Sequence, residues 1–387
     1  MYIIKRKTNL GGKDMKKVAI LTNGGDAPGL NAVIRAIVKT AQTHGIEAYG
    51  YIEGYKGLLN NDYVRLDPNG NASGILDKGG TIIGTSNNTN VFHYKVVKED
   101  GSIEYQDLSD KCVENIKNAG FECIFTLGGD GTQKSSRDFC LKGVNCIGVP
   151  KTIDNDVAHT ETTFGYNTAV SIAMEALDRL HTTANSHHRV LTLEVMGRYA
   201  GWIALESAIA GGADVALIPE IPYDIDKVVE KINKRKMAGK EFSIVVVSEG
   251  AKPKGGQISI KRMLDDGAGL DNIRLGGAGE LVAEQIEKLT GMTTRNTVLG
   301  YVQRGGTPSS FDRVLSSKYG VKAMELAMQG IFKVLVTYKG GEMGYVDLDE
   351  VVGKDSEIGA ASSKNRTVPL DDDLIKVARE LDICLGD

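Results

Sequence analysis

Several features that define common protein classes are missing from this 387-residue chain. It has only 8 prolines, too few for a proline-rich linker, and no apolar run approaches the roughly 18 residues that a membrane span needs. Lysine plus arginine number 46 against 50 aspartates and glutamates, so the basic excess of a general nucleic-acid binder is absent. The charged first residues are followed by no apolar stretch of the kind found in secretory signals. We therefore expect a protein that binds neither nucleic acid nor membrane.

Common metal, redox and nucleotide motifs are missing as well. The five cysteines form no C-x-x-C pair and are odd in number, and Cys123 and Cys146 lie in apolar runs. Free buried cysteines are typical of the reducing cytoplasm, where we place the protein. No H-E-x-x-H occurs, so the pair His187-His188 indicates a surface or subunit contact rather than a metal site. Neither G-x-x-x-x-G-K-[ST] nor G-x-G-x-x-G is present, which excludes a P-loop and a standard dinucleotide fingerprint.

Short apolar runs alternate with amphipathic stretches along most of the chain. The runs are continuously apolar, which is typical of strands buried on both faces of a parallel sheet. The predicted strands are Val18–Thr22, Cys123–Leu127, Cys146–Val149, Val190–Val195, Val215–Ile218, Ile244–Val247 and Val298–Val302. Helices are predicted after Asn31, which we expect to cap the first one, and over Thr168–Thr183 and Glu280–Leu289. This alternation predicts an α/β protein with more than one doubly wound unit.

Glycine is abundant, 47 of 387 residues, and three clusters of it are predicted to connect a strand to a helix. They are LTNGGDAPGLN (21–31), GGTIIGT (79–85) and LGGDGT (127–132). Such a turn points backbone N–H groups and the positive end of a helix at an anion. One cluster alone is as readily a plain turn, whereas three in one half of the chain, with Asp130 in the third, favour a phosphate site.

An acidic loop, PKTIDND (150–156), directly follows a predicted buried strand. The carboxyl end of a parallel strand is where open α/β sheets bind ligands. In phosphoryl transfer one carboxylate can accept the proton of the attacking hydroxyl while another holds Mg²⁺, so Asp154 and Asp156 can serve different tasks. Lys151 adds a mobile positive charge. The alternative is an Asx-turn that caps a helix, and it weighs more for Asp156 than for Asp154.

Further polar residues follow later strands. Arg198, after Gly197, can clamp a phosphoryl oxygen, and Glu249 can accept hydrogen bonds from sugar hydroxyls. Tyr301 and Arg304 lie beside flexible glycines in GYVQRGG (300–306). Each residue alone is equally compatible with a helix cap or a surface ion pair. Together they indicate an anionic, hydroxylated ligand such as a sugar phosphate.

Seven of these motifs, in order, resemble those of bacterial-type 6-phosphofructokinases. They are GGDAPG (24–29), GGT (79–81), GGDGT (128–132), PKTIDND (150–156), MGR (196–198), SEG (248–250) and GYVQRGG (300–306). The resemblance runs from about Lys16 to beyond Asp312. GGDGT is shared with NAD kinases and lipid kinases, whereas TIDND and MGR at this spacing separate the families.

The resemblance implies two Rossmann-like α/β domains with mostly parallel sheets and the active site in the cleft between them. Residues 15–165 with about 303–355 would form the domain that binds the phosphoryl donor. Residues 166–302 with about 356–387 would bind fructose 6-phosphate, and residues 1–14 would be a disordered extension. It further implies a homodimer or homotetramer in which Arg189 and Arg295 reach the substrate site of a neighbouring subunit.

Individual roles also follow from the resemblance. Asp154 would be the base on the 1-hydroxyl of fructose 6-phosphate, Asp130 would hold Mg²⁺, and Thr152, Arg198 and Lys151 would act on the transferring group. The donor would be bound by Gly25, Gly129, Asp130, Gly131 and Thr132. The sugar phosphate would be bound by Thr152, Ile153, Asp154, Arg189, Met196, Gly197, Arg198, Glu249, Arg295, Tyr301, Val302, Gln303 and Arg304.

The identity of the donor depends on departures from the family pattern. Lys151 and Tyr301 are similar to the pyrophosphate-using and mixed subgroup, as is the charged, glycine-rich insert over 251–279. Pyrophosphate users typically carry Asp at the position of Gly131, where a carboxylate would crowd and repel a nucleotide α-phosphate. Since Gly131 leaves room for the longer donor while Lys151 excludes nothing, we expect ATP rather than pyrophosphate. Asn87 replaces an arginine that touches donor phosphates in ATP-dependent relatives.

Two readings outside this enzyme class stay open at this point. GGDGT alone is compatible with a kinase of NAD or of a lipid. A catalytically silent sugar-phosphate sensor is the other alternative, although a sensor need not retain a base, a metal ligand and a phosphate clamp together, as Asp130, Asp154 and Arg198 do here.

Overall fold

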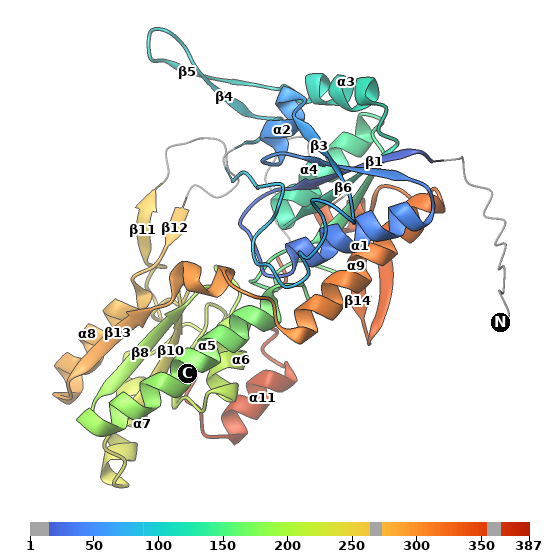
Figure 1. The fold of residues 1–387 in the computed structure, drawn as a ribbon. Coiled ribbons are helices and arrows are strands. Elements are labelled where there is room, and N and C mark those ends of the chain that lie inside the picture. The colour runs from blue at the N-terminus through green and yellow to red at the C-terminus, as the bar shows by residue number, and fades with distance from the viewer. Residues whose placement is uncertain (1–14, 88, 264–272, 354–364) are drawn as a thin grey trace, which may run out of the picture.

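The computed structural model describes residues 15–87, 89–263, 273–353 and 365–387. The predicted extension over residues 1–14 and part of the 251–279 insert lie outside these residues. Two sheets organise the two halves of the molecule (Figure 1). The strands are β1 (Lys17–Thr22), β2 (Glu47–Tyr51), β3 (Tyr63–Leu66), β4 (Tyr94–Val97), β5 (Ile103–Gln106), β6 (Cys123–Gly128), β7 (Cys146–Pro150), β8 (Val190–Val195), β9 (Val215–Leu217), β10 (Ser243–Ser248), β11 (Ile260–Met263), β12 (Ile273–Leu275), β13 (Thr294–Val298), β14 (Val334–Lys339) and β15 (Glu342–Asp347). The helices are α1 (Leu30–Thr43), α2 (Tyr55–Asn60), α3 (Ser109–Ala119), α4 (Asp130–Leu141), α5 (Tyr166–His187), α6 (Trp202–Ala210), α7 (Ile225–Met237), α8 (Ala278–Thr290), α9 (Ser310–Met328), α10 (Leu348–Val352), α11 (Asp373–Glu380) and the 3₁₀ helix η1 (Gly300–Arg304).

The larger sheet has seven strands in the order β15-β14-β7-β6-β1-β2-β3. Its central strands are parallel, and the edge strands β3 and β15 are antiparallel to their neighbours. Successive side chains of β1 enter different cores: Val18 and Ile20 pack with α1 and α9, whereas Ala19 and Leu21 pack with residues of α2 and α3. Both faces are therefore buried, which explains the continuously apolar sequence of these strands.

The smaller sheet has four parallel strands in the order β13-β8-β10-β9. Leu191 and Leu193 of β8 pack on the side of α5 and α6, and Val190 packs on the side of α7 and α8. The C-terminal helix α11 contributes Ile375 and Ala378 to the α5–α6 side. Together the two sheets confirm an α/β fold with mostly parallel strands.

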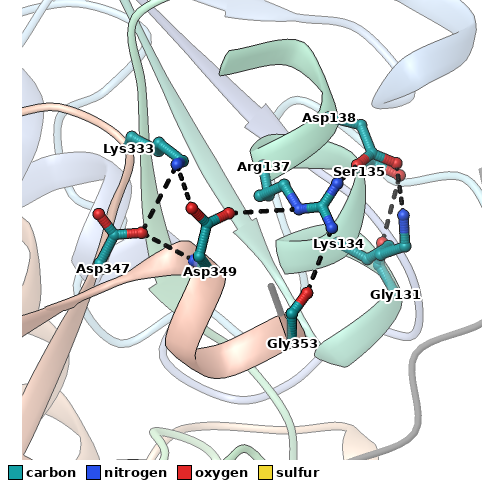
Figure 2. A network of polar contacts seen from close by, with 9 residues as sticks. All are labelled: Gly131, Lys134, Ser135, Arg137, Asp138, Lys333, Asp347, Asp349 and Gly353. Atoms are coloured by element: carbon teal, nitrogen blue, oxygen red, sulfur yellow. Dashed lines mark hydrogen bonds and ion pairs between the residues drawn. The ribbon is translucent and has the colours of Figure 1, made fainter. Parts of the chain in front are cut away.

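Helix α4 begins at Asp130, and a polar network that involves its later residues Lys134, Arg137 and Asp138 anchors it (Figure 2). Arg137 is almost fully buried; its Nη1 lies 2.9 Å from Asp138 and its Nε lies 3.5 Å from Asp349 of α10. Lys134 also pairs with Asp138, at 2.7 Å. Lys333, just before β14, pairs in turn with Asp349. These contacts fix the direction of α4 against the edge of the sheet.

Three local predictions were wrong. The strand predicted over Val298–Val302 is β13, which ends at Val298, followed by η1. Val298 and Val302 are mostly exposed. One ends the edge strand β13 and the other lies in η1, so these apolar residues do not belong to a buried strand. Asn31 does not cap α1, because Gly29 holds the cap position and Asn31 lies inside the helix.

The third error concerns the GGTIIGT segment, 79–85, which lies in an irregular stretch without an adjoining strand or helix. Separately, no helix among the described residues is long and apolar enough to cross a membrane.

Candidate active site

The GGDAPG loop leaves the carboxyl end of β1 and leads into α1. Asn23 N–H donates to the carbonyl of Leu127 at 3.0 Å, so the loop lies directly beside the end of β6. Gly29 has φ of 108°, a left-handed conformation that glycine adopts without strain, and α1 begins at the next residue. The first turn of α1 is thereby directed at the edge of the sheet, where helix N–H groups can bind an anion.

The GGTIIGT segment packs against this loop although it is not a strand-to-helix turn. Gly24 N–H donates to the Ser86 carbonyl at 3.0 Å, and the Thr85 hydroxyl donates to the Gly24 carbonyl at 2.7 Å. The Asn31 amide holds the start of the segment, donating to the carbonyls of Lys78 and Gly79 at 3.1 and 3.2 Å. Hydrogen bonds therefore hold the GGDAPG and GGTIIGT segments against each other.

Gly79 also contacts the glycine motif GYVQRGG, 300–306, at Gly306. A methyl group at Gly79 would lie 2.2 Å from the carbonyl oxygen of Gly306, so only glycine permits this approach. The GYVQRGG segment is thereby held against the first two glycine motifs, which lie more than 200 residues earlier in the sequence.

The third glycine motif and the acidic loop end the neighbouring strands β6 and β7. Asp130 begins α4, with Gly129 at the cap position. Lys151 N–H donates to the Gly128 carbonyl at 3.0 Å, which continues the strand pairing into the two loops. The Asp130 carboxylate and the N–H groups of the first turn of α4 thus lie next to the acidic loop.

Lys151 is buried and reaches back to the first glycine loop. Its ammonium group donates to the carbonyl of Gly25, and a methyl group at Gly24 would lie 3.5 Å from it. Burial, and then the charge of Arg304, lower the pKa of Lys151 to about 8. Lys151 therefore lies against the first glycine loop, in surroundings that disfavour its charged form.

The acidic loop is held in a fixed conformation. Asp154 N–H donates to the Thr152 hydroxyl at 3.0 Å, and the Thr163 hydroxyl donates to the Thr152 carbonyl at 2.8 Å. Ile153 is fully buried and Asp154 is 4% exposed. Asn155 has φ of 54°, a left-handed conformation that its side-chain hydrogen bonds to the segment 161–163 stabilise.

The MGR and SEG turns pack together at the ends of β8 and β10 in the smaller sheet. Arg198 N–H donates to the Glu249 carboxylate at 3.2 Å. A methyl group at Gly250 would lie 1.8 Å from the Arg198 carbonyl oxygen. Met196 N–H donates to the buried Gln303 side chain at 2.8 Å, which ties η1 to the same turn.

Residues from the two sheets meet in one site. Arg304 places Nη2 3.9 Å from the Asp154 carboxylate and donates from Nη1 to the Asp26 carbonyl at 3.3 Å. Burial, and then the charge of Asp154, raise the pKa of Glu249 to about 7. Asp154 of the larger sheet, Glu249 of the smaller sheet and Arg304 of η1 therefore act on one another electrostatically.

Three carboxylates gather on the side of the larger sheet. Burial, followed by the charges of Asp154 and Asp130, raises the pKa of Asp156 to about 7. Asp130 and Asp154, to which the family resemblance gives different roles, thus influence the same neighbouring residue. Within the described residues no group of three or more His, Cys, Asp or Glu side chains is placed to hold a metal ion by itself. A cation at these carboxylates would need water or a bound phosphate to complete its coordination.

Arg189 and Arg295 do not join this site within the chain. Both lie at the amino ends of β8 and β13, while Met196 follows the carboxyl end of β8. A strand of this length separates its ends by about 20 Å. Arg295 is largely exposed and contacts Glu287 of α8. Tyr301 and Val302 are also exposed, on the surface of η1.

Sequence reasoning missed the contribution of the C-terminal segment. Arg366 N–H donates to the Asp156 carbonyl at 2.7 Å, and Arg366 Nη1 donates to the Asn155 carbonyl at 3.1 Å. No glycine cluster or strand ending marks this arginine in the sequence, so its role becomes visible only when the chain is folded. The approach of Gly79 to Gly306 was missed for the same reason.

The arrangement combines the parts that phosphoryl transfer requires. Backbone N–H groups at two helix starts can bind a polyphosphate, and the buried carboxylate of Asp154 lies near Glu249, a second carboxylate that can orient an acceptor hydroxyl. Arg304 and Lys151 place positive charge beside these groups, which ligands that carry phosphate would need.

Comparisons with known proteins agree with this chemistry. Residues 17–327 match a family model described as Phosphofructokinase. The chain is 53% identical over 375 residues to a Clostridium perfringens protein named ATP-dependent 6-phosphofructokinase 2, covering 96% of this chain and 99% of that one. A Chloroflexus aggregans protein named ATP-dependent 6-phosphofructokinase is 45% identical over 96% of this chain and 98% of its own. A crystal structure of a pyrophosphate-dependent phosphofructokinase from Marinobacter aquaeolei has a similar fold, with a TM-score of 0.74 at 22% identity, over 95% of this chain and 92% of that one.

Proposed function

This chain belongs to the phosphofructokinase family, and from that membership and the site we propose that it transfers the γ-phosphoryl group of ATP to the 1-hydroxyl of fructose 6-phosphate. The products are ADP and fructose 1,6-bisphosphate, a step of glycolysis. Relatives of nearly the same length, at 53% and 45% identity, carry ATP-dependent 6-phosphofructokinase in their names. The observation that carries the proposal is the meeting of Asp154, Glu249 and Arg304, from separate parts of the fold, beside the glycine loops.

We assign Asp154 as the general base. The 1-hydroxyl oxygen attacks the γ-phosphorus, the bond from that phosphorus to the leaving oxygen of ADP breaks, and the hydroxyl proton passes to the Asp154 carboxylate. One of its oxygens, Oδ1, is buried and accepts no hydrogen bond among the described residues. Glu249 would accept hydrogen bonds from the sugar, and Arg304 would bind the sugar phosphate.

The remaining predicted residues divide between donor and acceptor. We propose that Gly25, Gly129, Gly131 and Thr132 bind the donor through the two helix starts, and that Thr152, Lys151 and Arg198 stabilise charge on the transferring group. Met196, Gly197, Ile153, Tyr301, Val302 and Gln303 would shape the acceptor side. Because Gln303 is buried and holds Met196, its contribution is to support the turn.

A magnesium ion fits the acidic cluster. The charges of Asp154 and Asp130 raise the pKa of Asp156, and a cation would offset that repulsion; Mg²⁺ prefers one or two carboxylates completed by water and phosphate oxygens. We propose that Asp130 holds the ion, with Asp156 next to it. When bound, Mg²⁺ would neutralise charge on the donor phosphates.

We further propose that the enzyme is cytoplasmic and forms a homodimer or homotetramer. The position of Arg189 and Arg295 at the opposite end of the smaller sheet supports self-association, because these cations can reach a substrate phosphate only in a neighbouring subunit. Mixing inactive Asp154→Asn protein with inactive Arg295→Ala protein tests this idea. Recovery of activity on subunit exchange would support shared sites, and none would argue against them.

A coupled assay with fructose 6-phosphate, MgCl₂ and either ATP or pyrophosphate tests the function. We expect turnover with ATP and at least tenfold lower kcat/KM with pyrophosphate. Preference for pyrophosphate would overturn the donor assignment. Turnover of NAD or a lipid but not of fructose 6-phosphate would overturn the acceptor, and binding of fructose 6-phosphate without turnover would indicate a sensor.

A further inference from the structure

The C-terminal segment that precedes α11 crosses from one half of the site to the other. Asn365 forms an antiparallel bridge with Val157, immediately after the acidic loop. Two residues after Arg366, Val368 N–H donates to the Glu220 carboxylate at 2.9 Å. The same carboxylate oxygen accepts the N–H of Gly201 at 2.9 Å, just after the MGR turn. The segment over 365–368 is thus bonded to the acidic loop directly and to Gly201, which follows the MGR turn, through Glu220.

Arg366 is the residue of this segment whose side chain contacts both the acidic loop and the start of α6. Its Nη1 donates to the Asn155 carbonyl at 3.1 Å, and its backbone N–H donates to the Asp156 carbonyl at 2.7 Å. Its guanidinium group lies over the ring of Trp202, 3.9 Å from the ring centroid, and Trp202 Nε1 donates to the Arg366 carbonyl at 3.4 Å. Trp202 begins α6, four residues after Arg198.

These contacts are made to the part of the acidic loop whose backbone is in a left-handed conformation. Asn155 separates the two aspartates and is held in a left-handed conformation, which costs about 1 kcal/mol or more for a residue with a Cβ. Arg366 donates to the two peptide carbonyls that follow Asp154. The planar guanidinium group can hold such a geometry while it stacks on an aromatic ring, which an ammonium group cannot do equally well.

We propose that Arg366 is a positioning residue for the acidic loop and links that loop to the MGR side of the site through Trp202. Its guanidinium group acts through the peptide carbonyl of Asn155, which helps to fix the direction of the Asp154 carboxylate, while the backbone bond to the Asp156 carbonyl is kept by any side-chain substitution. This inference deepens the proposed kinase function and rests on it, because its kinetic consequence requires that Asp154 be the base.

The kinetic test compares Arg366→Ala with Arg366→Lys and with a matched control, Arg379→Ala. Arg379 lies in α11, is half-exposed and pairs with Asp387, far from the acidic loop in its contacts. With ATP and fructose 6-phosphate we expect Arg366→Ala to lower kcat about 10- to 100-fold while both KM values change less than about threefold, since misplacing a reacting group by about 1 Å costs this much. Arg366→Lys keeps the charge and is expected to recover part of the loss. The control should match the wild type.

Two measurements keep the test independent of activity. Trp202 is the single tryptophan, so its emission reports directly on the stacking, and we expect a shift to longer wavelength in Arg366→Ala but not in Arg379→Ala. Hydrogen–deuterium exchange should become faster in peptides covering residues 152–157 in the Arg366→Ala protein alone. Unchanged exchange there, or a kcat within twofold of wild type after the emission has shifted, would overturn the proposal. If the wild type lacks kinase activity, the proposed function fails, while faster exchange would still support the positioning role.

Discussion

Replacing Asp154 by Asn removes the proposed base with almost no change in shape. The backbone N–H of residue 154 keeps its hydrogen bond to Thr152, so the loop should hold its conformation. Loss of a positioned general base typically lowers turnover by 10²–10⁴-fold, or about 3–5 kcal/mol of transition-state stabilisation. We expect a decrease of this size in kcat, with KM values for both substrates changed much less.

The same substitution has an electrostatic consequence that a mere loss of folding would not produce. The charge of Asp154 is the second cause, after burial, of the raised pKa values of Glu249 and Asp156. Without that charge both pKa values should fall, so less like-charge repulsion remains at pH 7, which offsets the lost pairing with Arg304, and the melting temperature should stay close to that of the wild type.

The assay is steady-state kinetics with both donors, with thermal melting and the pH dependence of the KM for fructose 6-phosphate. Asp382→Asn is the control, because Asp382 is largely exposed and pairs with Lys231 at the surface. Asp154→Asn with a kcat within tenfold of wild type would refute the assignment of the base. A large decrease in melting temperature would refute the argument about repulsion.

Four further changes test separate parts of the account. Gly131→Asp should raise the KM for ATP at least tenfold and affect pyrophosphate much less; undiminished use of ATP would contradict the steric argument. Because Glu249 has a pKa raised to about 7, the KM for fructose 6-phosphate should rise as pH falls below 7, and Glu249→Gln should show a high KM without that pH dependence. Gly79→Ala puts a methyl group 2.2 Å from the Gly306 carbonyl oxygen and should destabilise the fold by about 1–3 kcal/mol in thermal or urea unfolding, whereas Gly305→Ala, with its nearest contact at 4.0 Å, should not. Arg137→Ala breaks a buried ion-pair network and should lower the free energy of unfolding by about 3 kcal/mol. Both KM values should stay near wild type; a raised KM for ATP would mean that the network also shapes the donor site.

The parts of the fold that follow from local pattern were predictable. Strands such as β1 and β8 consist mainly of apolar residues on both faces, because both faces of a parallel sheet are covered, and this signal is contained within six residues. Val298–Val302 failed because an apolar residue on an edge strand or turn has the same sequence character as a buried one, although the structure leaves Val302 63% exposed. Burial depends on neighbours that the local sequence does not contain.

The candidate site divides in the same way. Asp154 and Glu249 are found from sequence, since each follows a continuous apolar run at the carboxyl end of a strand. The position of Asn31 in the first turn of α1, holding the GGTIIGT segment, depends on a partner some 50 residues away. Arg366 lies more than 200 residues from the loop it contacts. Such contacts are set by the fold and carry no local signature.

The most direct test of the account follows the phosphoryl group itself. Fructose 6-phosphate labelled at C1 with ¹³C is mixed with ATP and the wild-type enzyme, and the product is examined by ³¹P and ¹³C NMR. We predict a second phosphate ester coupled to the labelled C1 and one equivalent of ADP for each ester formed. An unmodified C1, with ATP consumed or intact, would contradict the transfer that we assign to this site.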